Sequence, residues 1–390
     1  MNGRYYSYLN TAVILLSQYD GSLPFHHFIR QFFREHPKHG SRDRKSIASL
    51  CYACFRTGNL FQEYDLPTRI LLSVFLVQEK QEQIISLLRP EWPDLSHAQL
   101  HERLDFLRSI GISVDLSRLF PLSDRLSPSI RESFITSHIQ QPRLFLRIRP
   151  GYEDIVSEKL FRAGIPFNRS GTRVELANGT DVSQALEIDK EVVIQDMNAQ
   201  RTGELMQRAV AASPANPLVW DACAASGGKS ILLHDISPES SLIVSDVRTS
   251  ILENLKKRFS AAGISDYQLF RADLERETPN MPQVDILLAD VPCSGSGTWG
   301  RTPEYLQNFT DKDLDRYVRL QQRILQHALP LLRPGGQLIY MTCSVYAAEN
   351  EEQVAFIQQK GFRLQMSGLF EGWQNQADSL YGAWLTKNIT

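Results

Sequence analysis

The sequence predicts an α/β protein in which a doubly wound parallel sheet forms the C-terminal half, after an all-helical region and a small α/β module. Two observations carry this prediction. Short apolar runs alternate with helical stretches from residue 218 onward, and apolar residues recur at helical spacing, without strand alternation, over residues 5–140. Alternation of strands and helices at this spacing is typical of a parallel sheet with helices on both faces.

The chain has 390 residues, which is too long for one ordinary core. Changes in the periodicity of its apolar residues divide it into an all-α domain over 1–140, a small α/β linking module over 141–204 and a Rossmann-like domain over 205–390. In the first region, residues such as Phe25, Ile29 and Phe32 recur at spacings of three and four, which indicates amphipathic helices.

The individual elements follow from the apolar runs and the turn residues between them. In the linking module we expect strands at 144–148, 173–176 and 192–194 and a helix at 152–163. In the last region we expect strands at 218–220, 242–245, 268–271, 286–289 and 338–341, with helices at 250–262 and 311–332.

Composition excludes several classes of protein. The chain is 42% hydrophobic and 22% charged, as in soluble globular proteins. Its longest apolar stretch, near 70–77, is too short to cross a bilayer, and its beginning lacks the features of a secretory leader. Five scattered cysteines do not suggest a disulfide framework. We therefore expect a cytoplasmic protein without a membrane anchor, and its net charge of −2 leaves polyanion binding to local patches.

Two cysteines follow predicted strands at the C-terminal edge of the sheet. Cys293 comes after the apolar run 284–289, and Cys343 comes after the run 337–340. Open α/β sheets bind ligands at this edge. Both cysteines lie downstream of a glycine-rich turn at 221–229, so the pattern predicts a dithiol active site beside a nucleotide-like cofactor.

Acidic residues at successive strand ends indicate what kind of cofactor the turn would hold. Asp221, Asp246, Asp273 and Asp290 end the first four predicted strands. Carboxylates can accept hydrogen bonds from ribose hydroxyls and attract a cationic centre, but they repel a pyrophosphate. Each aspartate alone is better explained as a cap of a helix or turn, whereas the set of four favours a cofactor site.

Three segments of the chain resemble signature motifs of the Sun-type RNA cytosine-5 methyltransferases. They are Asp-Ala-Cys-Ala-Ala-Ser-Gly-Gly-Lys at 221–229, Asp-Val-Pro-Cys-Ser-Gly-Ser-Gly-Thr at 290–298, and the segment from Thr-Cys-Ser-Val at 342–345 to Glu-Asn-Glu at 349–351. Residues 195–200 resemble the segment that precedes the family's catalytic sheet, and residues 381–385 resemble its last strand.

The resemblance extends from about residue 144 to the C-terminus. Upstream, residues 40–44 are similar to the NusB-like helical extension of bacterial ribosomal RNA enzymes. The chain departs from the family pattern at Ser226, where proline is usual, at Val291, where alanine is usual, and at Ala347 and Ala348, where Pro-Glu is common. None of these departures removes a reacting group.

The resemblance implies S-adenosylmethionine as cofactor and RNA, most plausibly ribosomal RNA of the small subunit, as substrate. It implies that Cys343 attacks carbon 6 of cytosine, that Asp290 hydrogen-bonds the base near ring nitrogen 3, and that Cys293 serves release of the adduct. Lys229 would favour the thiolate by its charge, with an exposed lysine at a helix start as the alternative. The implied cofactor residues are Cys223, Ala224, Ala225, Ser226, Gly227, Gly228, Lys229, Asp246, Asp273 and Asp290.

Two features of the helical region carry open alternatives. Cys51 and Cys54 form a Cys-x-x-Cys pair without a second pair, so two small core residues explain them better than zinc does. A basic cluster could hold RNA phosphates or could be a solvated helix face. Its members are Arg30, Arg34, Lys38, Arg42, Arg44 and Lys45. We expect no metal, and we expect a monomer.

Two other functions compete with RNA methylation. A DNA cytosine-5 methyltransferase would use the Pro-Cys motif for attack, which makes Cys293 the nucleophile and leaves Cys343 unexplained. An RNA-binding scaffold with a vestigial cofactor site is the rival from another class. The intact set of Cys343, Cys293, Asp290 and Asp246 argues against it.

Overall fold

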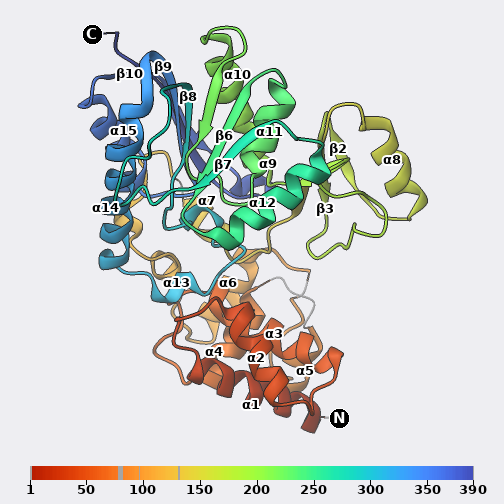
Figure 1. The fold of residues 1–390 in the computed structure, drawn as a ribbon. Coiled ribbons are helices and arrows are strands. Elements are labelled where there is room, and N and C mark those ends of the chain that lie inside the picture. Colours follow the sequence, from red (N-terminus) through yellow and green to blue (C-terminus); the bar gives the residue numbers. More distant parts are fainter. Residues whose placement is uncertain (1, 78–81, 96, 131, 390) are drawn as a thin grey trace. The chain divides into compact units, whose positions relative to one another are not determined.

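The structure is a computed structural model that describes residues 2–77, 82–95, 97–130 and 132–389 (Figure 1). It divides into two compact units, each built from separate pieces of the chain. The first unit comprises Met1–Asp124, Arg131–Gln141 and Trp299–Asp311, and the second comprises Arg125–Ile130, Pro142–Thr298 and Lys312–Thr390. The predicted boundaries of three domains stay a prediction.

The first unit is helical throughout its described part. Its α-helices are α1 (Asn2–Gln18), α2 (Phe25–Glu35), α3 (Ser41–Arg56), α4 (Leu66–Leu76), α5 (Glu82–Leu88), α6 (Leu100–Ser109), α7 (Glu132–Ser137) and α13 (Tyr305–Asn308). Asp65 starts α4 because its side chain accepts a hydrogen bond from the backbone N–H of Thr68, at 2.9 Å. The apolar faces meet in one core that includes the fully buried Leu15, Phe25 and Leu50.

The last helix of this unit comes from a distant part of the sequence. Residues Trp299–Asp311 follow the segment that carries Cys293, yet they pack among the helices of the first unit. The Trp299 ring lies 5.2 Å from that of Phe120, and Glu304 accepts the backbone N–H of Phe25 at 3.0 Å. Gln307 donates to the Cys54 carbonyl at 2.8 Å. The chain therefore returns to the helical core directly after the second predicted motif.

The linking module of the second unit is a four-stranded antiparallel sheet in the order β2-β3-β1-β4. Its elements are β1 (Leu144–Ile148), α8 (Glu153–Arg162), β2 (Asn168–Ser170), β3 (Arg173–Leu176) and β4 (Val192–Ile194). The sequence did not indicate β2, because all three of its residues are exposed and give no apolar signal. Leu146, Val156 and Val174 close the core of the module between sheet and helix.

The main sheet has seven strands in the order β10-β11-β9-β8-β5-β6-β7. Its strands are β5 (Leu218–Asp221), β6 (Ser241–Asp246), β7 (Tyr267–Arg271), β8 (Val284–Asp290), β9 (Leu332–Thr342), β10 (Phe362–Phe370) and β11 (Leu380–Lys387). Strands β9, β8, β5, β6 and β7 run parallel to one another, whereas β11 pairs antiparallel with both β9 and β10. The order reverses between β5 and β8, which is where α/β sheets bind ligands.

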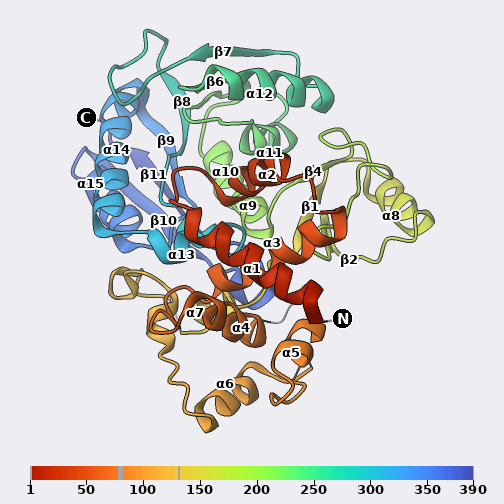
Figure 2. The ribbon, with the colours of Figure 1, turned by 90° about the horizontal axis from the view of Figure 1, so that it is seen from below.

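Helices cover both faces of this sheet, as Figure 2 shows. They are α10 (Gly203–Ala211), α11 (Gly228–Ile236), α12 (Thr249–Ala262), α14 (Asp311–Ala328) and α15 (Glu351–Gln358). The short helix α9 (Met197–Arg201) precedes them and contacts β1 of the linking module. Neighbouring strand residues point to opposite faces. Val219 therefore packs with α10, α11 and α12, and Trp220 packs with α14 and α15. This arrangement confirms the predicted Rossmann-like fold class.

Two details differ from the sequence-based expectation. Helix α14 ends at Ala328 and not at residue 332, because Pro330 lies in a following 3₁₀ helix. Strand β10 was not predicted. The short 3₁₀ helices are η1 (Leu116–Leu119), η2 (Ser123–Arg125), η3 (Ser296–Thr298), η4 (Leu329–Leu331), η5 (Ala347–Glu349) and η6 (Trp373–Asn375). None of the described helices has both the length and the apolar run that a membrane crossing requires.

Candidate active site

The two cysteine thiols lie together at the C-terminal edge of the main sheet. Cys293 follows β8 and Cys343 follows β9, and these parallel strands are hydrogen-bonded neighbours whose register pairs Asp290 with Met341. The two Sγ atoms are 3.3 Å apart, and both residues are partly exposed. Residues fifty positions apart in sequence thus form one dithiol site because adjacent parallel strands end at the same edge.

A half-buried lysine provides positive charge near this pair. Lys229, in the first turn of α11, places its Nζ 2.5 Å from Oδ2 of Asp290, and its side chain is only 16% exposed. Burial would lower the pKa of Lys229, but the charge and hydrogen bond of Asp290 and the charge of Cys343 raise the pKa above its usual value. Lys229 is therefore a cation directed at the site and not an exposed lysine at a helix start.

The two thiols have different surroundings. The pKa of Cys293 is raised well above its ordinary value, first by its hydrogen bond to Cys343, then by burial and by the charges of Cys343 and Glu349. Lys229 interacts electrostatically with Cys343. The arrangement disfavours a thiolate at Cys293 and places the cation beside Cys343.

The glycine-rich turn connects β5 to α11. Gly227 has a φ of 83°, and a Cβ atom there would lie 2.7 Å from the ring of Phe259, so the position requires glycine. The adjacent Ser226 accepts hydrogen bonds from Arg258 through its carbonyl at 3.0 Å and its hydroxyl at 2.9 Å. Arg258 also pairs with Asp189, 2.7 Å away. A serine in place of the usual proline is thus held by a side chain of α12, a contact that no local sequence pattern indicates.

The predicted acidic set lies at the strand ends, in different environments. Asp246 ends β6, is 6% exposed, and accepts the backbone N–H groups of Ala225 and Arg248 at 3.1 and 2.9 Å. Asp246 therefore fixes the glycine-rich turn and also serves the capping role that was the alternative. Asp273, which follows β7, forms an ion pair of 3.3 Å with the exposed Arg276.

Asp221 is buried at the end of β5, and Cys223, two residues later, is partly exposed. Ser230 donates to Oδ2 of Asp221 at 2.6 Å, whereas Oδ1 is buried without a hydrogen-bond partner among the described residues. Burial raises the pKa of Asp221 to about 7. Burial also raises the pKa of the Cys223 thiol well above its ordinary value, so this cysteine is a packing residue and not a nucleophile.

One buried carboxylate near the thiols had no role assigned from sequence. Glu349 is fully buried and bonds to the residues that follow both cysteines, Ser294 and Ser344. The sequence quoted it only as part of the third motif. Its position six residues after a candidate nucleophile is a weak signal, because an acidic residue there reads equally well as the start of α15.

Other predicted residues lie apart from the dithiol. Cys51 and Cys54 are buried in α3, and burial raises the pKa of both thiols. In the part of the chain that the structure describes, no three His, Cys, Asp or Glu side chains gather to hold a metal. The basic cluster is on α2, on α3 and between them, where Arg30, Arg34, Lys38, Arg42 and Lys45 are exposed and Arg44 is half-buried.

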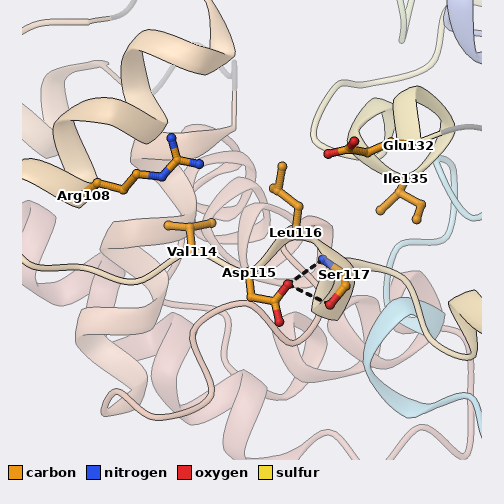
Figure 3. A pocket seen from close by; sticks show the side chains of 7 residues that line it. All are labelled: Arg108, Val114, Asp115, Leu116, Ser117, Glu132 and Ile135. Carbon is orange, nitrogen blue, oxygen red and sulfur yellow. Dashed lines mark hydrogen bonds between the residues drawn. The ribbon is translucent and has the colours of Figure 1, made fainter.

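The helical unit contains two polar pockets that lack the predicted catalytic groups. A pocket of about 330 Å³ is lined by Arg4, Tyr5, Tyr8, Arg42, Lys45, Ser46 and Gln83, and so includes two members of the basic cluster. Figure 3 shows a second pocket, of about 380 Å³, near Arg108 and Glu132. There the Asp115 carboxylate is occupied by the backbone N–H and the hydroxyl of Ser117, at 3.0 and 2.7 Å, which start a short helix.

Residues 208–381 match the model of the family described as 16S rRNA methyltransferase RsmB/F. This region is a methyltransferase domain of the RsmB/F family. The match covers the glycine-rich turn and both cysteine loops, so the resemblance to Sun-type methyltransferases is confirmed.

A relative of the RsmB/F domain is ribosomal RNA small subunit methyltransferase B of Enterobacter sp. (strain 638). The two are 28% identical over 243 residues, which is 58% of this chain and 54% of the relative. The chain therefore spans about half the length of this curated relative.

Two solved structures share the fold. The crystal structure of PH0851 has a TM-score of 0.71 at 19% identity and covers 99% of both chains. The structure of NSun6 from Pyrococcus horikoshii with SFG has a TM-score of 0.55 at 16% identity and covers 64% of this chain and 92% of that one. At these identities the likeness shows the fold alone.

Proposed function

We propose that this protein transfers a methyl group from S-adenosylmethionine to carbon 5 of a cytosine in small-subunit ribosomal RNA, through a covalent cysteine adduct. The observation that carries the proposal is the 3.3 Å thiol pair with the Lys229–Asp290 ion pair beside it. Support comes from the RsmB/F match over residues 208–381 and from a relative named as a ribosomal RNA small subunit methyltransferase.

The turn and the strand ends fit this cofactor by their donor and acceptor chemistry. Asp246 and Asp273 offer carboxylates at successive strand ends to ribose hydroxyls and an adenine amine, while Gly227 and Gly228 let the backbone approach closely. Further support comes from NSun6, which shares the fold and whose structure contains SFG, an analogue of S-adenosylmethionine. When bound, S-adenosylmethionine supplies an electrophilic methyl group.

Carbon 5 of cytosine is a poor nucleophile until a thiolate adds to carbon 6. In the proposed mechanism the Cys343 thiolate forms this S–C bond, and the electron pair of the 5,6 double bond moves toward ring nitrogen 3. Asp290 would hydrogen-bond the ring near this nitrogen, and Lys229 would stabilise the thiolate before attack. The enamine-like carbon 5 then takes the methyl group.

Release reverses the addition. The proton on carbon 5 leaves to a base, the 5,6 double bond re-forms, and the Cys343 sulfur departs as a thiolate. We assign Cys293 to the departure of the sulfur, because its thiol lies against Cys343 and its raised pKa keeps it protonated, so that it can donate a hydrogen bond to the leaving thiolate. The raised pKa of Cys293 and the interaction of Lys229 with Cys343 also argue against attack by Cys293, which is the arrangement in the DNA enzymes. A vestigial scaffold would not need the cation Lys229 beside Cys343.

Bisulfite sequencing of ribosomal RNA tests the proposal in the cell. A strain that lacks this gene should lose 5-methylcytosine at a small-subunit position, and the wild-type gene should restore it while a Cys343→Ala gene should not. Transfer of labelled methyl from S-adenosylmethionine to that RNA by the purified protein is the matching assay. Unchanged ribosomal RNA in the deletion strain, together with no labelled product, would refute the proposal.

A further inference from the structure

The loops that carry Cys293 and Cys343 both form hydrogen bonds with the same buried side chain, that of Glu349. Glu349 has no exposed surface and lies in the 3₁₀ helix η5, just before α15. Its Oε1 accepts the backbone N–H of Ser294 at 2.8 Å and the amide of Gln321 at 2.9 Å. Its Oε2 accepts the hydroxyls of Ser294 and Ser344, both at 2.5 Å. One carboxylate thus contacts the residue after Cys293 and the residue after Cys343.

Further hydrogen bonds keep this carboxylate in place. Gln321 of α14 also donates to the Pro292 carbonyl at 3.1 Å, and the Tyr340 hydroxyl donates to the backbone carbonyl of Glu349 at 2.7 Å. Each of the four contacts on the carboxylate comes from a group that can donate, which is what an ionised carboxylate needs when buried. Removing a carboxylate from water costs free energy. We therefore expect Glu349 to have a role beyond starting a helix.

The next residue fixes one loop more tightly. Asn350 accepts the Thr342 hydroxyl at 2.6 Å and donates to the Ser344 carbonyl at 3.0 Å, which brackets Cys343 on both sides. The loops also meet directly, since the hydroxyls of Ser296 and Ser344 are 3.1 Å apart. Glu349 brings an acceptor with a full charge to this group, since its carboxylate accepts directly from Ser294 and Ser344, the residues that follow the two cysteines.

We propose that Glu349 is a positioning residue that holds the two cysteine loops in register, so that the attacking and releasing thiols keep their spacing. The proposal rests on the proposed function of those thiols. The hydrogen bonds of the Glu349 carboxylate go to Ser294, Ser344 and Gln321, so it acts on the cysteines through the residues beside them. Burial raises the pKa of Glu349, and its four donors oppose that rise. The charge of Glu349 in turn raises the pKa of Cys293.

Removal of the carboxylate should slow chemistry and leave binding intact. We expect Glu349→Ala to lower kcat by about 100-fold, the scale for a small misplacement of reacting groups. The KM for RNA and the Kd for S-adenosylmethionine should stay within about twofold, because the hydrogen bonds of the carboxylate go to Ser294, Ser344 and Gln321 and not to the acidic set. Glu349→Gln keeps one acceptor oxygen for Ser294 and Gln321 and should retain kcat to within about tenfold of wild type.

Glu352 provides a matched control on the same segment. It is an exposed residue in the first turn of α15. Glu352→Ala should therefore keep the wild-type kcat. A folded Glu349→Ala protein with the kcat of Glu352→Ala would overturn the proposal, and so would Glu349→Gln failing as badly as Glu349→Ala.

If Glu349→Ala does not fold, serine variants decide the question. Ser294→Ala and Ser344→Ala each delete one hydroxyl contact, and the double variant should lose less than the product of the two single losses, because both act through one carboxylate. A double variant with wild-type kcat contradicts the proposal. If the wild-type protein itself methylates no RNA, the proposed function is contradicted. The positioning role of Glu349 is contradicted only when the wild-type protein is active and the variants keep its kcat.

Discussion

The chain contains two pairs of cysteines that contrast in spacing and in surroundings. Cys51 and Cys54 lie three residues apart on α3, and both are buried in the helical core. Cys293 and Cys343 come from separate loops fifty residues apart, yet their sulfur atoms are 3.3 Å from each other. The pair with Cys-x-x-Cys spacing lies in the core, and the pair that is far apart in sequence forms the candidate dithiol.

The difference lies in charge and access. Burial raises the pKa of Cys51 and Cys54, and the Cys51 sulfur has a backbone carbonyl, that of Ala12, at 4.0 Å. The second pair is partly exposed at a sheet edge, with the Lys229 cation beside it. Thiol reactivity follows the stability of the thiolate, so the environment at the strand ends matters more than Cys-x-x-Cys spacing.

The largest expected effect separates the two members of the candidate dithiol. Cys343→Ala should abolish methylation and form no covalent complex, because attack on carbon 6 never occurs. Cys293→Ala should permit attack and methyl transfer but block collapse of the adduct, so a protein–RNA species should survive denaturing electrophoresis. If the trapped complex formed with the Cys343 variant instead, Cys293 would be the attacking residue, as in the DNA enzymes. If both variants methylated RNA and neither trapped it, the dithiol mechanism would be wrong for this protein.

The stability of the folded protein should depend on pH through the buried Asp221. Folded Asp221 keeps its proton up to about pH 7, whereas its ordinary pKa is 3.8, so the folded state binds more protons between these values. Stability should therefore fall as the pH rises through this window, by up to about 4 kcal/mol. Asp221→Asn, which has no proton to lose, should gain stability relative to wild type between pH 5 and pH 8. Thermal unfolding of both proteins at the two pH values measures this, and a constant difference in Tm would contradict it.

The cofactor side of the dithiol site should depend on Asp246. Asp246→Ala should weaken S-adenosylmethionine binding by about 1–3 kcal/mol, the scale for leaving hydrogen-bonding groups unpaired in a buried site. The loss has two sources, a missing acceptor for ribose and a released turn at Ala225. Calorimetric titration of the folded variant gives the change. Unchanged affinity would remove Asp246 from the cofactor site.

The helix that carries Cys51 and Cys54 should contribute RNA affinity and no chemistry. Replacement of Arg42, Arg44 and Lys45 with alanine should weaken RNA binding and reduce the slope of log affinity against log salt by roughly 2, because phosphate contacts release counterions. Methyl transfer at saturating RNA should change little. Binding measured across a salt series tests this. An unaltered affinity and slope would make the basic cluster a solvated surface.

The smallest effect belongs to the buried pair itself. Cys51→Ala and Cys54→Ala should keep full methyl transfer and lose about 1 kcal/mol of stability each, from lost packing in the helical core. Denaturant unfolding and the methylation assay report the two quantities separately. A loss of activity without loss of stability would show that these cysteines are more than core residues.

Sequence patterns were sufficient for the fold class and for most of the strands that position the site. The runs at 218–220, 242–245 and 286–289 became β5, β6 and β8, because buried parallel strands are continuously apolar. The exposed β2 gave no such pattern. The antiparallel strand β10 was also missed. The NusB-like character of the helical region, the cytoplasmic location and the monomeric state stay predictions.

The sequence by itself determined which residues end each strand, and thereby that Cys293 and Cys343 would share one edge of the sheet. Only the tertiary structure decided what surrounds them. Lys229 forms an ion pair with Asp290, Arg258 donates a hydrogen bond to Ser226, and Glu349 accepts hydrogen bonds from Ser294 and Ser344. It also decided that Trp299–Asp311 packs in the helical unit. The reason is physical. Strand ends follow from local apolar periodicity. Except for the bond between Glu349 and Ser344, these contacts join residues tens to hundreds of positions apart in the sequence, and they exist only after the sheet has ordered its strands.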